Sequence, residues 1–203
     1  YSRSNLKPMS GRPLGPYGLH CNKPIRELAD FQGKRIRSVG VAFAALIRSL
    51  GAVPVNLVTA ETYEALERGI LDCTITDPSL SYGWKWNEVA KYYLNVPIGV
   101  TWGQYIVMNR SKFDSLPAEV QDILNQLNEE SYVRFIEELE RTNAQVFKEW
   151  QENGQVEIID FPADFFQDLL ENDPGIAAVR AEWIERATAQ GVPAQEIVDE
   201  LTR

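Results

Sequence analysis

One arginine stands where it could bind an anion. Arg37 follows the apolar Ile36 near the end of a predicted strand and precedes a turn at Gly40. Its planar guanidinium can hold a carboxylate through two parallel hydrogen bonds, and a cleft of low dielectric would let that pair fix orientation and specificity. The spacing alone leaves a second interpretation open, in which Arg37 is a surface arginine that makes a weak ion pair.

The motifs of the common catalytic templates do not occur in the sequence. It contains no GxSxG nucleophile elbow, no Walker loop and no GxGxxG fingerprint. The single histidine, His20, adjoins Cys21, and neighbouring side chains of a strand point to opposite faces, which argues against a nucleophile–base pair. We therefore expect His20 to be structural or at the surface, and we expect no catalytic residue and no cofactor.

The two cysteines, Cys21 and Cys73, allow two interpretations. In an oxidising compartment they could pair, and closing that loop would stabilise the fold by about 4 kcal/mol in the chain-entropy model. They could also be two separate buried thiols that behave as small hydrophobic side chains. Neither belongs to a CxxC pair, and one histidine cannot complete a Cys/His zinc site, so we expect no metal site.

A regular alternation of elements would position Arg37. Apolar periodicity and glycine breaks predict a strand, helix, strand, helix and strand at residues 34–39, 41–50, 54–58, 60–68 and 70–75. This alternation is typical of a mainly parallel sheet covered by helices, in which ligands lie beyond the carboxyl ends of the strands. Besides Arg37, those ends carry Thr59, Thr76 and Asp77.

The second half of the chain is predicted to be mostly helical. A helix around residues 86–93 and a strand at 103–109 precede an amphipathic helix over residues 117–152, a length that favours a scaffold crossing the molecule. A short strand and three further helices are then expected near residues 156–159, 165–171, 177–189 and 194–201.

Composition excludes several classes of partner. The 203 residues carry a formal net charge of −9, so an acidic surface would repel nucleic acid and anionic lipid. No apolar run is long enough to span a bilayer, so we expect no direct membrane insertion. The sequence begins at Tyr1 without a charged and apolar leader, and we expect a signal peptide to have been removed or left out.

Several blocks between residues 25 and 117 carry a resemblance to a known family. They read IRELADFQGKRIRSVG, LGAVPVNLVTAETYEALERGILDC, NEVAKYYL and YIVMNRSKFDSLPAEVQ. In order and spacing they resemble the solute-binding proteins of tripartite ATP-independent periplasmic (TRAP) transporters, of the C4-dicarboxylate-binding type. The resemblance implies a periplasmic-binding-protein-like α/β fold, in which two lobes close on a ligand and a long helix braces both.

The same resemblance implies a division of the chain. Residues 1–23 would be a linker or the remnant of a first lobe, 24–110 the ligand-binding α/β lobe, and 111–203 the bracing helix with the C-terminal helices. An additional N-terminal lobe portion precedes the matched region in the family, so we expect the cleft to be incomplete within this chain.

The resemblance also assigns site residues. The arginine that the family uses for the ligand carboxylate falls on Arg37, and further contact positions fall on Thr59, Thr76, Asp77, Thr101 and Trp102. Many members have a second arginine upstream, where this chain has Tyr17. This departure weakens the case for a dicarboxylate and favours a monocarboxylate with a polar or aromatic body, which Tyr17 and Trp102 could contact through aromatic faces.

The function implied is that of a receptor and not of an enzyme. We expect a periplasmic protein that closes by a hinge on a small organic acid and delivers it unchanged to the membrane permease subunits of a TRAP transporter. The alternative is a ligand-sensing or protein-interaction module without a transport role, which would have an exposed apolar patch. An enzyme of another type would need a perturbed acid–base pair in the cleft.

Overall fold

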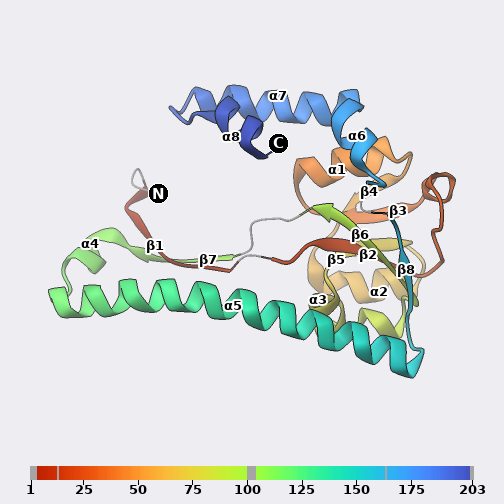
Figure 1. Ribbon diagram of the computed structural model, residues 1–203, viewed down its shortest axis with the longest axis horizontal. Coiled ribbons are helices and arrows are strands. Elements are labelled where there is room, and N and C mark those ends of the chain that lie inside the picture. Colours follow the sequence, from red (N-terminus) through yellow and green to blue (C-terminus); the bar gives the residue numbers. More distant parts are fainter. Residues whose placement is uncertain (1–3, 13, 100–103, 163, 202–203) are drawn as a thin grey trace.

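The computed structural model describes residues 4–12, 14–99, 104–162 and 164–201. An α/β body lies at one end of the molecule, a two-stranded ribbon lies beside the N-terminus, and one long helix runs beneath both (Figure 1). None of the helices within the described ranges combines the length and the apolar character needed to cross a membrane.

A six-stranded sheet forms the centre of the body. Its order is β4 (Val53–Asn56), β3 (Arg35–Ser38), β5 (Cys73–Thr76), β2 (Tyr17–Cys21), β6 (Tyr92–Gly99) and β8 (Glu157–Asp160). The pairs β3–β4, β3–β5 and β6–β8 are parallel, whereas β2 is antiparallel to both β5 and β6. The predicted mainly parallel sheet is confirmed, and since β2 alone is reversed, its first residue lies at the edge where its neighbours end.

Helices cover both faces of this sheet (Figure 1). On one face lie α1 (Gly40–Ser49), α6 (Gln167–Asn172) and α7 (Pro174–Thr188); on the other lie α2 (Thr62–Glu67), α3 (Pro78–Gly83) and one end of α5 (Ala118–Asn153). The remaining helices are α4 (Arg110–Asp114) and α8 (Ala194–Leu201), with short 3-10 turns η2 (Leu28–Phe31), η3 (Thr59–Glu61) and η4 (Trp86–Glu88). The largest apolar core lies on the α1 face and includes Leu19, Ile36 and Ile75.

The ribbon consists of β1 (Leu6–Arg12) and β7 (Gln104–Asn109), which pair antiparallel from Leu6 opposite Asn109 to Arg12 opposite Gln104. Helix α5 contacts β1 of the ribbon as well as α3 and β8 of the body. At the body end, Trp150 is fully buried against Tyr93, with ring centroids 5.5 Å apart. The expected bracing helix is therefore present, and its 36 residues span about 54 Å at 1.5 Å per residue.

One expectation about local structure was wrong. Residues 86–93 are not a helix: η4 is followed by β6, which begins at Tyr92 and is held between β2 and β8 by pairing with distant strands. The error arises because β6 is stabilised by long-range pairing and not by local sequence preference. Residues 6–12 and 17–21 are strands, which among the two alternatives for residues 1–23 fit the remnant of a lobe better than a linker, and the division of the chain stays a prediction.

Candidate functional site

Arg37 is buried at the carboxyl end of β3, with 5% of its surface exposed. Its Nε donates to the Leu57 carbonyl oxygen at 2.9 Å and its Nη2 donates to Thr59 Oγ1 at 3.0 Å. Burial lowers the pKa of Arg37, while the nearby Tyr17 acts in the opposite direction. No carboxylate within the described ranges forms an ion pair with Arg37. The site therefore holds a buried cation that its neighbours orient and that no carboxylate of the described part of the chain neutralises.

The sheet register brings other predicted residues to the same edge. Tyr17 opens the reversed strand β2 and lies opposite Gly99, the last residue of β6. Gly18 lies opposite Thr76, the last residue of β5, and Thr59 follows β4. The Tyr17 ring is buried and packs on Phe43 of α1, with centroids 5.9 Å apart. Tyr17, Arg37, Thr59 and Thr76 thus converge at one edge of the sheet.

The N-terminus of α1 adds positive potential to this edge. Helix α1 begins directly after β3, and its N-cap residue, Val39, makes no side-chain capping bond. Gly40 has a φ of +77°, a left-handed conformation that glycine adopts without strain. Free backbone N–H groups at a helix start favour a bound anion. The buried guanidinium and this helix end therefore both contribute positive potential that attracts an anion.

Thr76 and Asp77 are buried and have structural partners. The Asp77 carboxylate caps α3 by accepting from Leu80 N at 2.9 Å and from Ser79 Oγ at 2.6 Å. The Thr76 hydroxyl donates to the Asp77 carbonyl oxygen at 3.0 Å, and the Tyr93 hydroxyl donates to the Thr76 carbonyl oxygen at 3.1 Å. The structure thus gives Asp77 a capping role, and a contact of either residue with a ligand stays a prediction.

Thr101 and Trp102, the two remaining predicted contact residues, lie outside the described residues. Sequence reasoning did not single out Phe43, the Leu57 carbonyl oxygen or Gly99 as parts of the edge. Phe43 could have been found, because the helix predicted over residues 41–50 places it in the first turn after Arg37. A backbone carbonyl such as that of Leu57 leaves no signal in residue types.

His20 lies inside the body and not at this edge. It is fully buried, its Nδ1 is hydrogen-bonded to Ser81 Oγ, and its ring packs on Tyr93 and Trp150 at 5.7 and 5.2 Å. Burial lowers the pKa of His20 to about 3, so the imidazole is neutral at physiological pH. Within the described ranges no group of three or more His, Cys, Asp or Glu side chains could hold a metal ion.

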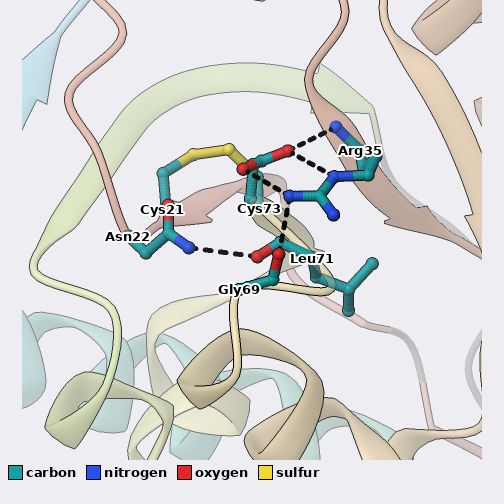
Figure 2. Close-up of polar contacts among 7 residues, drawn as sticks. Cys21, Asn22, Arg35, Gly69, Leu71 and Cys73 are labelled. Carbon is teal, nitrogen blue, oxygen red and sulfur yellow. Dashed lines mark hydrogen bonds and ion pairs between the residues drawn. A yellow bond between two sulfur atoms is a disulfide. The ribbon is translucent and has the colours of Figure 1, made fainter.

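The opposite end of β3 and β5 is closed by covalent and ionic bonds (Figure 2). Cys21 and Cys73, direct partners across β2 and β5, form a disulfide, which decides between the two interpretations left open by the sequence. Beside it, Arg35 binds Asp72 through Nε at 3.0 Å and Nη2 at 3.1 Å and donates to the Gly69 carbonyl oxygen at 2.6 Å (Figure 2). We call the region of Cys21, Asn22, Arg35, Gly69, Leu71, Asp72 and Cys73 the closed end.

The chain matches known proteins over most of its length. Residues 15–172 match the family model DctP, described as bacterial extracellular solute-binding protein, family 7. A curated relative, the C4-dicarboxylate-binding periplasmic protein DctP of Rhodobacter capsulatus, is 32% identical over 114 residues, which cover 56% of this chain and 34% of the relative. This chain spans between 34% and 45% of the length of three such relatives.

Solved structures share the fold. A TRAP periplasmic solute binding protein from Desulfovibrio salexigens with bound orotic acid has a TM-score of 0.82 at 23% identity, covering 97% of this chain and 62% of that one. DctP7, a Bordetella pertussis extracytoplasmic solute receptor binding pyroglutamic acid, has a TM-score of 0.82 at 22% identity, covering 100% of this chain and 64% of that one. With the family model matching more than half of its residues, this chain belongs to family 7 of the bacterial extracellular solute-binding proteins.

Proposed function

We propose that this chain forms the carboxylate-binding part of a periplasmic receptor, which takes up a small organic acid and delivers it unchanged to the permease subunits of a TRAP transporter. One observation carries the proposal: Arg37 is 5% exposed and has no carboxylate partner among the described residues. A buried charge without a counter-charge is unfavourable, so an arriving carboxylate would gain from neutralising it.

The arrangement around Arg37 favours one carboxylate in one orientation. The Leu57 carbonyl oxygen and Thr59 Oγ1 fix the plane of the guanidinium before a ligand arrives. Preorganisation of this kind reduces the entropy lost on binding. The N-terminus of α1 would add a favourable potential for the same anion. Many members of the family have a second arginine where this chain has Tyr17. A monocarboxylate therefore fits the site better than a dicarboxylate.

A periplasmic location and the absence of catalysis are parts of this proposal. The Cys21–Cys73 disulfide is compatible with an oxidising compartment. The family membership supports binding and release without chemistry. His20 and Asp77, the titratable groups that an enzyme would need nearby, are buried and hydrogen-bonded to Ser81 and to the start of α3.

The alternative, a protein-interaction module, has one observation in its favour. Apolar side chains are exposed along β7 and α5, among them Ile106 at 59%, Ile123 at 50% and Leu127 at 52%. Contiguous exposed apolar surface is typical of protein interfaces. This alternative predicts that no small acid binds at the Arg37 edge.

Calorimetric titration of the full-length protein against a panel of organic acids tests the proposal. We expect Arg37→Ala to weaken binding of the tightest acid at least about 30-fold, because truncating one partner of a buried charge pair costs about 2–5 kcal/mol. Arg37→Lys should lose most of this affinity, because an ammonium cannot reproduce the planar fork.

Arg35 offers a matched control on the same strand. Arg35→Ala removes an arginine two residues away whose partner is Asp72, and it should leave the affinity unchanged. Full affinity in Arg37→Ala, with a native circular dichroism spectrum, would rule out the assigned role.

A further inference from the structure

An apolar cavity of about 460 Å³ opens beside the Arg37 edge. It lies between the start of α1, the end of β6, and helices α6 and α7, and its walls include Val39, Phe43, Leu46, Ile98, Leu170 and Ile176. Every described residue that lines it is apolar or glycine. Its volume falls within the range of about 300–1,000 Å³ that is common for small-molecule sites.

The cavity and the carboxylate site share an edge. Val39, in the cavity wall, lies two residues after Arg37, and Gly99, also in the wall, pairs with Tyr17. The Tyr17 ring in turn packs on Phe43 of the cavity wall. A solute whose carboxylate is bound at Arg37 would therefore meet Tyr17 and then the apolar wall.

Gly99 helps to keep this cavity open. It has a φ of +141°, which side-chain-bearing residues rarely adopt, and a Cβ at this position would lie 3.7 Å from Phe43 Cε1. The absence of a side chain thus leaves space at the junction of the cavity and the edge.

The lining chemistry selects the solute. A second carboxylate or several hydroxyl groups in this cavity would lose their hydration and find no side-chain donor among the described lining residues. The free backbone N–H groups at the start of α1 lie at one end of the cavity, beside Arg37, where they would serve the first carboxylate. An aromatic ring or a branched alkyl group would instead gain about 25 cal/mol for each Å² of apolar surface removed from water.

We propose that the solute is a monocarboxylate with an apolar body, an aromatic or branched aliphatic acid, whose body lies in the cavity beside α1. This inference rests on the proposed function, because Arg37 must bind the carboxylate for the body to be directed there. It goes beyond that function in naming the chemical class of the solute and the residues that select it.

Calorimetry with paired ligands tests the class of solute. Phenylacetate and 4-methylpentanoate should bind at least 10-fold more tightly than succinate and gluconate. Tighter binding of succinate or gluconate would overturn the inference.

Ala42→Leu tests the cavity itself. Ala42 lines the cavity from an exposed position on α1, and leucine is also a good helix former, so the variant should fold normally while filling the space. We expect it to weaken phenylacetate binding at least 10-fold and propanoate binding less than 3-fold. Equal effects on the two acids, or no effect on either, would overturn the inference.

Val39→Asn provides an independent polar variant. Asparagine is favoured at an N-cap, so this change should not weaken α1 while it places an amide in the cavity wall. Phenylacetate should again bind at least 10-fold more weakly. The matched control is Ile70→Asn, which replaces an apolar residue that is 53% exposed outside the cavity and should leave binding unchanged.

The two proposals fail in different ways. If Arg37→Ala abolishes binding but Ala42→Leu and Val39→Asn do not discriminate between acids, the receptor function stands and the apolar body is rejected. If phenylacetate binds equally well to Arg37→Ala, the carboxylate site is rejected, and with it the inference that depends on it.

Discussion

Two arginines on one short strand have opposite surroundings. Arg35, at the start of β3, is exposed and bonded to Asp72 and to the Gly69 carbonyl oxygen, near the Cys21–Cys73 disulfide (Figure 2). Arg37, at the end of the same strand, is buried and bonded only to neutral oxygens of Leu57 and Thr59 among the described residues. The side chains are two positions apart, so both point to the same face of the sheet.

The pKa shifts of the two arginines reflect these different surroundings. At the closed end Arg35 donates to the carboxylate of Asp72 through Nε and Nη2, and these hydrogen bonds raise the pKa of Arg35. For Asp72 itself, burial would raise the pKa, but the hydrogen bonds from Arg35 outweigh it and the pKa is lowered. At the Arg37 edge, desolvation lowers the pKa of the arginine, and no carboxylate among the described residues forms an ion pair with it. One end of the sheet thus carries a bonded ion pair, and the other carries the arginine to which we assign the ligand.

Removing the disulfide should have the largest effect on stability. Cys21→Ser with Cys73→Ser opens a connection between residues 52 positions apart, and we expect the free energy of unfolding to fall by about 4 kcal/mol. Urea denaturation with and without reductant measures this loss. The affinity of the folded variant for its acid should not change, and a parallel loss of affinity would show that the two ends are not independent.

Acid should destabilise the body through His20, by about 3 kcal/mol at pH 4. The pKa of His20 is near 6.5 when unfolded and about 3 when folded, so the unfolded chain binds more protons between these values. Stability is therefore full above pH 6.5 and falls as the pH is lowered toward 3, at about 1.4 kcal/mol per unit.

His20→Asn isolates this contribution, because an amide can keep a hydrogen bond to Ser81 but does not titrate. The difference in unfolding free energy between variant and parent should shrink or reverse from pH 7 to pH 4. A difference that is constant with pH would contradict the assigned titration.

The two arginines should respond in opposite ways to the same substitution. Arg35→Met removes a satisfied ion pair and strands Asp72, so stability should fall. Arg37→Met removes a desolvated charge, so the free energy of unfolding without ligand should stay constant or rise, by up to about 1 kcal/mol. Thermal denaturation of the two variants side by side measures this contrast, which disappears if Arg37 also stabilises the unliganded fold.

Loss of the Thr59 hydroxyl should have the smallest effect. Thr59→Val removes the acceptor at 3.0 Å from Arg37 Nη2, and we expect the affinity for the acid to fall 3- to 10-fold, as about 1 kcal/mol per hydrogen bond implies. Thr59→Ser keeps the hydroxyl and is the control. Equal affinities in the valine and serine variants would mean that the hydroxyl does not position the guanidinium.

Local patterns in the sequence were sufficient for much of the fold. The elements at residues 34–39, 41–50 and 60–68 were predicted because glycines mark their ends and apolar residues recur with the right period. The long helix was found for the same reason and occupies Ala118–Asn153. Arg37 could be proposed as a ligand contact because it lies near the end of a predicted strand and because the surrounding sequence resembles a known family.

Long-range pairing set the limit of those predictions. Strands β1, β2 and β6 exist through partners far along the chain, and the reversal of β2 cannot be read from its five residues. The disulfide stayed undecided for the same reason, because only the β2–β5 register brings Cys21 opposite Cys73. The capping role of Asp77 could have been suspected, since Pro78 follows it at the first position of α3.

The reversed strand also brings both connections between ribbon and sheet to one place. The chain passes twice between ribbon and sheet, from Arg12 to Tyr17 and from Gly99 to Gln104, and the residues at each end of these two passages are paired with each other. Tyr17 and Gly99 therefore border both these connections and the place where we propose that an acid is held. If the receptor closes on its ligand as proposed, a bound acid would contact the residues next to both connections, and so could alter the orientation of the ribbon relative to the body.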